Sequence, residues 1–251
     1  MVNRTITDLL DLSGRVAIVT GGGTHLGTAF TEALAELCEE TAASLRARSL
    51  KVTALSCDVT DEGSVDSLVD QVMEREGKLD VFVANAGGSN TTAHPPHGKV
   101  DEFRWTLEKN LTSTYICAQA AGRVMIPQKS GSIITLGSIA SRLASDPRIY
   151  NENFKRSGAP YMAAKAGVLV LTKALAAEYS PHGVRVNCIC PGQIPNDLTD
   201  KAQVEKFRTM NAFHRTGLAE DLKGACALLA SDAGKWITGT DILVDGGWSI
   251  W

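Results

Sequence analysis

A short apolar run followed by a cluster of glycines constrains the fold of this chain more than any other feature. Residues 15–20 are rich in β-branched side chains, which predicts a buried parallel strand. Residues 21–27 are rich in glycine. Phe30 and Leu34 then begin the apolar face of a helix. A strand, a glycine-rich turn and a helix form the first unit of a dinucleotide-binding fold, because glycines let backbone N–H groups approach a pyrophosphate at the helix N-terminus.

The same alternation of strand and helix continues along most of the chain. It predicts an α/β fold, a doubly wound parallel sheet of the Rossmann type, in a single domain spanning residues 1–251. Ligands of such sheets bind beyond the carboxyl ends of the strands, so polar residues at those ends are candidate site residues. We expect further strands at residues 79–84, 131–136, 184–190 and 241–244, and helices at residues 61–77, 100–125, 161–180 and 219–230.

One step of the alternation is missing. A dinucleotide fold places a second strand about 20 residues after its glycines, tipped by an acidic residue that binds the ribose. Here the first helix continues to about residue 48, and the next predicted strand is 51–57. Two interpretations stay open. Either a segment is missing from the recorded sequence near Leu37 and Cys38, which we favour because no turn residue interrupts the helix there, or the chain truly lacks the strand and 51–57 takes its place.

Tyr161 and Lys165 form the clearest pair of candidate catalytic side chains. Pro160 stands where a helix can begin, and the apolar pattern that follows it is helical. Tyr161 and Lys165 therefore lie one turn apart on one face. A cation close to a phenol favours the tyrosinate, so we expect Lys165 to lower the pKa of Tyr161 from about 10. A tyrosine tuned in this way can exchange a proton with an alcohol or a ketone.

The composition excludes several classes of protein. The net charge of −3 indicates neither nucleic-acid binding nor attraction to a membrane surface. No apolar run reaches the roughly 20 residues of a membrane span, and the N-terminus lacks the apolar core of a signal peptide. The six cysteines are scattered and lack metal-site spacing, so we expect reduced thiols, no metal and a cytoplasmic location.

The glycine turn at residues 21–27 is followed, later in the chain, by the pair Tyr161 and Lys165. With these and the further motifs given below, in this order, the chain resembles the short-chain dehydrogenase/reductase family over essentially its full length. Each motif alone is weak, whereas the complete set is specific. The resemblance implies a catalytic set of Asn110, Ser138, Tyr161 and Lys165. It also implies contacts to a nicotinamide cofactor from Gly21, Gly23, Thr24, His25, Leu26, Gly27, Asp58, Val59, Asn85, Ala86, Gly87, Tyr161, Lys165, Pro191, Gly192 and Ile194.

The resemblance assigns a role to each catalytic residue. Tyr161 is the general acid and base, and Lys165 lowers its pKa and binds the nicotinamide ribose. Ser138 orients the substrate oxygen, and Asn110 supports a water-linked proton relay to Lys165. The spacing from Ser138 to Tyr161 is longer than in the family, which makes Ser141 or Ser145 a rival for Ser138. We keep Ser138 because it follows its strand directly.

Other departures concern the cofactor. His25 stands where the family has a glycine, and Asn196 stands where a threonine often contacts the nicotinamide amide. The residue that selects between NAD and NADP would follow the missing strand. No Arg or Lys occurs in residues 21–27 to hold a 2′-phosphate, which tips the expectation slightly toward NAD. The family implies a homotetramer or homodimer, and helices 101–125 and 161–180 carry small and apolar residues on more than one face.

Two segments are expected to border the substrate pocket, an insertion at residues 142–159 and the tryptophan-rich tail after Gly247. Residues 193–217 are expected to form a lid-like loop. Polar and cationic residues of the insertion suit a sugar, a polyol or a sugar acid, and the tail resembles gluconate 5-dehydrogenase-like members. A 3-oxoacyl-carrier-protein reductase is the enzymatic alternative, and a catalytically silent binding subunit is an alternative of another class. The polar candidates are Arg142, Arg148, Asn151, Asn153, Lys155 and Arg156, with His94 and His97 nearby.

Overall fold

The computed structural model describes residues 4–34, 52–89, 94–146, 149–150 and 156–251 of the chain. These residues build one parallel sheet whose five strands lie side by side in chain order. The pairs Ile18 with Phe82 and Leu136 with Ile189 set two of its registers. The predicted strands are therefore confirmed, as β1 (Ala17–Val19), β2 (Val81–Ala84), β3 (Gly131–Leu136), β4 (Val184–Pro191) and β5 (Asp241–Val244).

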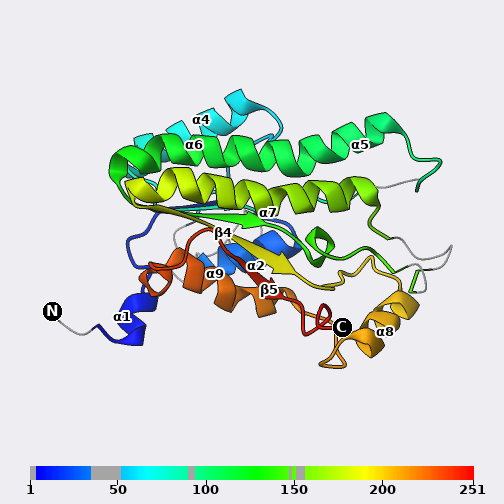
Figure 1. The fold of residues 1–251 in the computed structure, drawn as a ribbon. Coiled ribbons are helices and arrows are strands. Elements are labelled where there is room, and N and C mark those ends of the chain that lie inside the picture. The colour runs from blue at the N-terminus through cyan, green and yellow to red at the C-terminus, as the bar shows by residue number, and fades with distance from the viewer. Residues whose placement is uncertain (1–3, 35–51, 90–93, 147–148, 151–155) are drawn as a thin grey trace.

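Helices cover both faces of the sheet (Figure 1). The first face carries α4 (Glu62–Glu76), α5 (Val100–Leu107), α6 (Ser113–Gln128) and α7 (Ala159–Tyr179), and the second carries α2 (His25–Leu34) and α9 (Lys223–Ala230). Phe82, Met125 and Ile133 are fully buried under the first face, and Phe30 and Leu229 are fully buried under the second. The two-faced burial explains why the central strands read as continuous apolar runs.

Local signals place several helix ends where the sequence predicts them. The Asp61 carboxylate accepts a hydrogen bond from Gly63 N at 3.1 Å and caps α4. Gly77 ends α4 with φ of 73°, a backbone angle that favours glycine. A short helix, α1 (Ile6–Leu10), is an addition to the prediction, and a reciprocal capping box between Thr5 and Asp8 begins it.

The strand predicted at residues 51–57 is wrong over 52–57, which have no regular secondary structure. Leu55 and Cys57 still pack against the apolar core. A strand needs a backbone partner, and among the described strands β1 pairs only with β2. The predicted continuation of the first helix and the place of the missing second strand fall on residues 35–51, outside the described residues. A doubly wound sheet is defined by a reversal of strand order, which needs a strand on the free side of β1. The described residues contain no such strand, so this prediction also depends on residues outside them.

The long helix predicted at 100–125 is interrupted. Between α5 and α6 lies one π-helical turn, Glu108–Thr112, and Asn110 stands at its centre. A π turn inserts one extra residue into a helix and is frequent at functional sites. Asn110 is the buried residue of this turn. The helix also continues three residues further than predicted, to Gln128.

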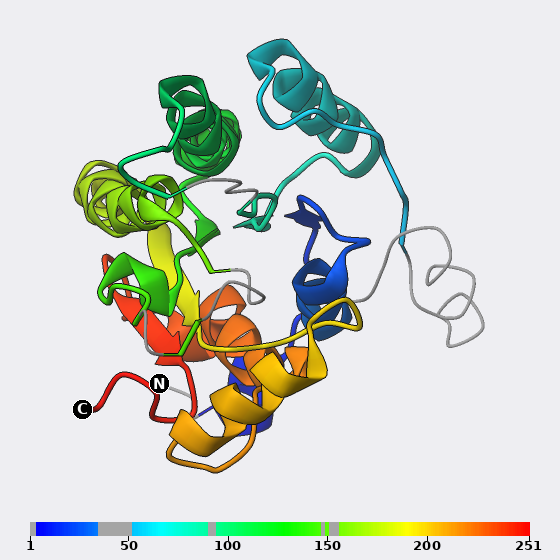
Figure 2. The same ribbon diagram turned by 90° about the vertical axis from the view of Figure 1, so that its right-hand side faces the viewer.

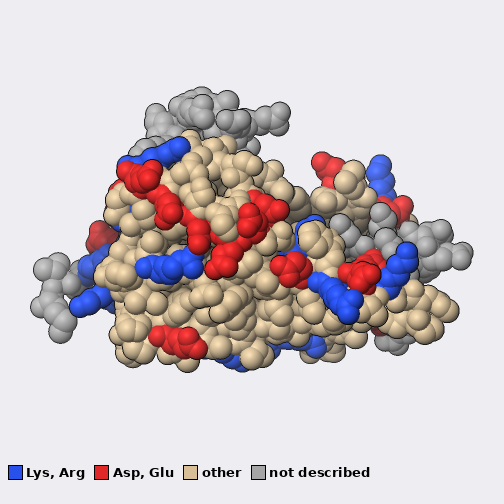
Figure 3. Space-filling model, turned by 90° about the horizontal axis from the view of Figure 1, so that it is seen from above, with Lys and Arg blue, Asp and Glu red and all other residues tan. Residues whose placement is uncertain are grey.

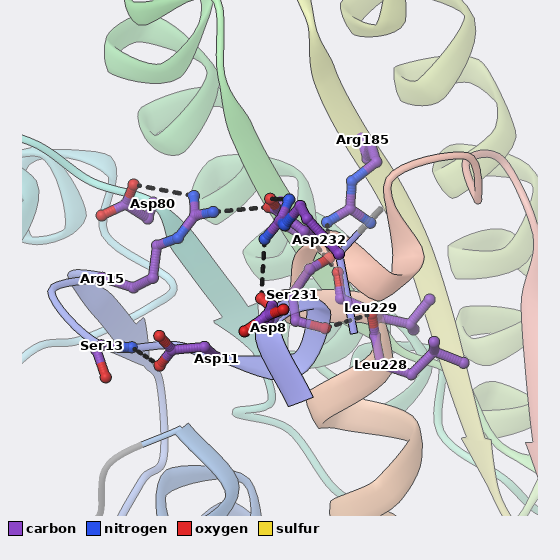
Figure 4. Close-up of polar contacts among 12 residues, drawn as sticks. Asp8, Asp11, Ser13, Arg15, Asp80, Arg185, Leu228, Leu229, Ser231 and Asp232 are labelled. Atoms are coloured by element: carbon purple, nitrogen blue, oxygen red, sulfur yellow. Dashed lines mark hydrogen bonds and ion pairs between the residues drawn. The ribbon is translucent and has the colours of Figure 1, made fainter. Parts of the chain in front are cut away.

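Charged side chains gather at the amino ends of the strands, opposite the expected ligand edge (Figure 4). Arg15 contacts Asp80 at 3.5 Å and Asp232 at 2.7 Å, and Arg4 contacts the other oxygen of Asp232 at 2.6 Å. Arg185 donates to the carbonyl of Ser231 at 3.3 Å. These contacts fasten the N-terminal segment to the turn after α9, so this cluster has a structural role.

On the face seen in Figure 3, acidic and basic side chains are mixed and surrounded by uncharged residues. Within the described ranges no broad basic area is visible on that face. Among the helices that the structure describes, none is both long and apolar enough to span a lipid bilayer.

Candidate active site

Figure 2 looks onto the carboxyl ends of the strands, where the predicted site residues gather. The turn between β1 and α2 and the segment after β2 lie on one side of this edge. The segment after β5 lies on the other side, and the segment after β4 runs across the edge toward α2 before α8 (Lys201–Met210) begins. Ser138 follows β3, the middle strand of the five, and α7 carries Tyr161 and Lys165. The fold therefore brings together residues that are far apart in the sequence.

The glycine turn is built so tightly that two of its positions accept only glycine. Gly21 has φ of 64°, and its carbonyl oxygen accepts a hydrogen bond from Thr24 Oγ1 at 2.6 Å. A Cβ on Gly27 would lie 1.9 Å from that carbonyl oxygen. The close packing leaves Gly23, Thr24 and His25 exposed at the start of α2. Such a turn with a helix N-terminus behind it fits the diphosphate of a dinucleotide.

Thr20 braces the ends of β1 and β2. Its hydroxyl oxygen accepts hydrogen bonds from Asn85 N and Ala86 N, both at 3.1 Å. The Asn85 amide donates in return to the carbonyls of Thr20 at 2.9 Å and Gly21 at 3.3 Å. The sequence did not predict this bracing of two strand ends by the Thr20 side chain.

Asn110 is fully buried, and its side chain is bound to the segment after β2. Its Oδ1 accepts from Gly88 N, and its Nδ2 donates to Gly88 O and Thr106 O, each at 2.9 Å. A Cβ on Gly87 would lie 2.7 Å from Asn110 Oδ1, so the glycine makes this approach possible. Asn110 thus holds the Asn85–Gly88 turn, and its part in a proton relay stays a prediction.

Tyr161 and Lys165 share a face of α7, as the spacing predicts. Lys165 is only 5% exposed, its Nζ donates to the carbonyl of Leu136 at 2.7 Å, and it lies 5.6 Å from the centroid of the Tyr161 ring. Burial lowers the pKa of Lys165 to about 8.

The pKa of Tyr161 differs from the expectation. Burial raises it, and a hydrogen bond with Ser138 opposes that rise. The expected lowering by Lys165 is not among these effects, and Lys165 Nζ donates its hydrogen bond to the Leu136 carbonyl at the end of β3.

The three candidate serines have separate partners. Ser138 follows β3, and its side chain acts to lower the pKa of Tyr161, as expected of the substrate-orienting serine. Ser141 Oγ donates to the carbonyl of Lys165 at 2.9 Å and accepts from Ser138 N at 3.1 Å. Ser145 Oγ donates to the carbonyl of Ser157 at 3.2 Å. Ser141 therefore connects the Ser138 turn to α7, and both rivals are engaged with backbone carbonyls, so Ser138 stays the predicted serine.

The segment after β4 borders a pocket of about 150 Å³. Gly192 and Ile194 line it, together with residues of the lid-like loop and of the turn after β5. Pro191 is the last residue of β4, and a Cβ on Gly192 would lie 2.5 Å from Asp245 Cα. Ser138 and Tyr161 do not line this pocket, which lies at the ends of β4 and β5.

Asp58 and Val59 lie in the irregular segment that precedes α4. Asp58 is exposed, and its carboxylate accepts from Thr60 N at 2.9 Å and Thr60 Oγ1 at 2.8 Å, which lowers its pKa. Val59 packs against the core. Asn196 is also engaged locally, since its Oδ1 accepts from Leu198 N at 3.1 Å. Their cofactor contacts stay predictions.

Arg142 of the insertion and the two cysteines of β4 each have a partner within the protein. Arg142 of the insertion forms an ion pair with Asp241 at the start of β5, so it braces the insertion against the sheet. Arg148, Asn151, Asn153 and Lys155 lie outside the described residues. Cys188 and Cys190 are buried on β4, with sulfur atoms 3.8 Å apart beneath Gly137. No cluster of metal-ligating side chains occurs among the residues described.

Comparisons with known proteins agree with this arrangement. A family model described as enoyl-(acyl carrier protein) reductase matches residues 17–249. A sorbose reductase of Candida albicans is 34% identical over 97% of this chain and 90% of its own length. An NADP-dependent mannitol dehydrogenase of Alternaria alternata is 33% identical, with 98% and 96% covered. A 3-oxoacyl-acyl-carrier-protein reductase of Synechocystis is 31% identical, with 94% and 97% covered.

Solved structures extend the similarity to the fold. A short-chain type dehydrogenase/reductase of Mycobacterium marinum has a TM-score of 0.88 and 31% identity, with 98% of this chain and 99% of that chain covered. A gluconate 5-dehydrogenase of Burkholderia cenocepacia, in complex with NADP and tartrate, has a TM-score of 0.86 and 29% identity, with 98% and 100% covered. With the glycine turn, the bracing asparagines and the serine, tyrosine and lysine all in place, this chain belongs to the short-chain dehydrogenase/reductase family, a family of oxidoreductases.

Proposed function

We propose that this protein is an NAD(P)-dependent oxidoreductase that interconverts a secondary alcohol and a ketone, and that its substrate is a sugar, a polyol or a sugar acid. One observation carries the proposal. Ser138, Tyr161 and Lys165 meet at the carboxyl edge of the sheet, beside a glycine turn that accepts no Cβ at Gly27. The named relatives that act on sorbose, mannitol and gluconate support the substrate class.

Each residue has a distinct task in this reaction. When bound, the nicotinamide supplies or accepts the hydride. The Gly21–Gly27 turn would hold the diphosphate, and Lys165 would hold the nicotinamide ribose. Ser138 orients the substrate oxygen, and Tyr161 gives it a proton in reduction or removes that proton in oxidation. A charged Lys165 close to the phenol would favour the tyrosinate.

The choice between NAD and NADP is part of the proposal. The lack of Arg or Lys in residues 21–27 favoured NAD slightly. The relatives weigh against that preference, because one is named NADP-dependent and one was solved with NADP. We therefore propose NADP as the first cofactor to test.

Two alternatives come from specific observations. The relative named 3-oxoacyl-acyl-carrier-protein reductase supports an acyl substrate. His25 at the start of α2 and the missing second strand support a silent binding subunit. Against the silent subunit, Ser138, Tyr161 and Lys165 are in contact, and a protein without catalysis has no physical need for that arrangement.

The assembly and the location complete the proposal. Trp105 on α5 is 52% exposed and Val170 on α7 is 68% exposed, which supports a homotetramer or homodimer joined through these helices. Light scattering of the purified protein tests it, and a stable monomer would refute it. The cysteine pattern supports a cytoplasmic location.

Calorimetric titration with NAD, NADH, NADP and NADPH is the first test of the proposed function. Micromolar binding of one pair establishes the cofactor, whereas binding of none makes the silent subunit the better hypothesis. Turnover is then measured with sorbose, mannitol and 5-ketogluconate, and with an acetoacetyl thioester for the acyl alternative. Tyr161→Phe should lower kcat by roughly 10²- to 10⁴-fold and leave nucleotide affinity nearly unchanged. Wild-type turnover in this variant would refute the assigned acid and base.

A further inference from the structure

Three aromatic side chains from separate parts of the chain meet beyond the ends of β4 and β5. Phe207 of α8 makes edge-on contacts with both Tyr150 and Trp248, at centroid distances of 6.0 Å and 5.8 Å. Tyr150 comes from the insertion, and Trp248 comes from the C-terminal tail. Phe207 is only 5% exposed, so it is a buried wedge between the other two rings. We call these three residues the aromatic wall.

The wall stands on a loop that is closed at its base. Gly217 N donates to Gln193 O at 3.0 Å, which joins the two ends of the lid-like loop. Asn211, which is buried just after α8, donates to the carbonyl of Asp245 at 2.8 Å. A Cβ on Gly246 would lie 2.7 Å from Asn211 Oδ1, so the tail turn packs directly on the loop. Backbone contacts at the base and ring contacts at the tip thus fix the wall in place.

One polar contact ties the wall to the catalytic edge. Gln193 Nε2 donates to the Tyr150 hydroxyl at 3.3 Å. Gln193 follows β4 after Gly192, and Ser138 follows β3 after Gly137. The two strands are paired in register, with Leu136 opposite Ile189 and Gly137 N bonded to Ile189 O. Gln193 and Ser138 therefore leave neighbouring strands at the same edge of the sheet.

The chemistry of this pair suits a hydroxylated ligand. The Gln193 amide and the Tyr150 phenol can each donate and accept hydrogen bonds. Both groups lie against an aromatic surface. A substrate hydroxyl can replace the bond between them and hydrogen-bond to each. A ligand hydroxyl that bridges the two groups makes a polar contact that an analogue without the hydroxyl cannot make. An unfunctionalised acyl chain would leave Gln193 and Tyr150 bonded only to each other.

We propose that Tyr150 and Gln193 are specificity-determining residues that bind a hydroxyl group on the part of the substrate beyond the reacting carbon, with the aromatic wall as their support. This inference rests on the proposed function and narrows it to substrates that carry hydroxyls next to the ketone. It assigns no proton transfer to either residue. The reaction at the carbonyl remains the work of Ser138 and Tyr161.

The test compares two ketones with the same six-carbon skeleton, sorbose and 2-hexanone, at saturating cofactor. Tyr150→Phe keeps the ring contact with Phe207 and removes only the hydroxyl. We expect kcat/KM for sorbose to fall roughly 3- to 10-fold, mainly through KM, while kcat/KM for 2-hexanone stays within twofold. Gln193→Leu should behave in the same way, and the double variant should lose less than the product of the two single effects. Tyr115→Phe, at an exposed tyrosine of α6, is the matched control.

The outcomes separate this inference from the proposed function. If Tyr150→Phe leaves sorbose reduction unchanged, or lowers the two ketones equally, the inference is wrong while the oxidoreductase assignment stands. If the wild-type protein reduces 2-hexanone and not sorbose, hydroxyl recognition is likewise wrong. If it turns over none of sorbose, mannitol, 5-ketogluconate and 2-hexanone with any nucleotide, the proposed function fails, and this inference fails with it. A selective loss on sorbose supports both.

Discussion

At the ends of β1 and β2 the carboxyl edge of the sheet is shaped by backbone turns and short polar side chains, whereas beyond β4 and β5 it is shaped by large aromatic ones. Figure 2 shows the two regions on opposite sides of the edge. In the first, Thr20 and Asn85 brace two strand ends with bonds of 2.9 to 3.3 Å, and Gly27 lies against the Gly21 carbonyl. In the second, Phe207 is wedged between Tyr150 and Trp248.

The difference fits the proposed function, in which one half binds the cofactor and the other binds the substrate. A diphosphate presents oxygens, so its half would need backbone N–H groups and room for close approach, which glycine provides. A small organic substrate presents a shape and a few polar groups, so its half would need side chains of defined volume. On this proposal, substitutions in the first half act on nucleotide binding and those in the second act on the substrate. Four predictions test this contrast.

The largest effect is expected in the glycine half. Gly27→Ala places a Cβ 1.9 Å from the Gly21 carbonyl oxygen, so the turn must open. We expect nucleotide affinity to fall roughly 10- to 100-fold, measured by calorimetry. Gly224→Ala in α9 is the matched control, because nothing lies within 4 Å of a Cβ there. Equal nucleotide binding by the Gly27 variant and the control would show that this turn does not hold the cofactor.

A substitution in the aromatic half should weaken binding of the ketone and leave nucleotide affinity unchanged. Phe207→Leu keeps an apolar side chain and removes both ring contacts, each worth about 0.5 to 1.5 kcal/mol. We expect KM for the ketone to rise about tenfold while the dissociation constant of the nucleotide stays within twofold. Steady-state kinetics and calorimetry on the same preparation measure both. A parallel loss of nucleotide affinity would mean that the two halves are not independent.

Lys165, which lies between the halves, predicts a pH dependence of stability. Its pKa is about 8 in the folded protein, against 10.5 as the ordinary value. Between these pH values the folded protein releases the proton first, so the unfolded chain binds more protons and the free energy of unfolding rises with pH. Below pH 8 the buried ammonium costs stability.

We expect Lys165 to raise the free energy of unfolding by about 1 to 3 kcal/mol between pH 7.5 and 10. Urea unfolding without cofactor measures this rise. Lys165→Met serves as the reference, and the rise should be present in the difference between the two proteins. Identical pH profiles would show that Lys165 is not buried as a cation in the folded protein.

The smallest effect is expected where Ser141 connects the Ser138 turn to α7. Ser141→Ala removes bonds of 2.9 Å to Lys165 O and 3.1 Å from Ser138 N. We expect kcat to fall roughly 3- to 10-fold with KM less affected, because Ser138 and Tyr161 lose alignment and not substrate contact. Ser141→Thr should restore most of the loss, and Ser145→Ala is the control. A change in KM alone would contradict a positioning role.

Several features were predictable because their signals lie within a few residues. The strand, glycine turn and helix at 15–34, the capped helix at 62–76 and the pair Tyr161 and Lys165 all follow from local periodicity and spacing. The strand predicted at 51–57 was wrong because its composition is local, whereas a strand depends on a neighbour. The π turn at Asn110 was missed because a continuous apolar pattern does not reveal one inserted residue.

The sequence by itself determined the fold class, and it predicted the nucleotide turn and the catalytic residues, because these predictions depend on motifs of a few neighbouring residues. Only the tertiary structure decided that Lys165 donates to Leu136 O, that Gln193 donates to the Tyr150 hydroxyl, and that residues 150, 207 and 248 form one wall. The physical reason is that side-chain partners are chosen by distance in space. Chain order records that distance only where two residues share a turn of helix or a strand end.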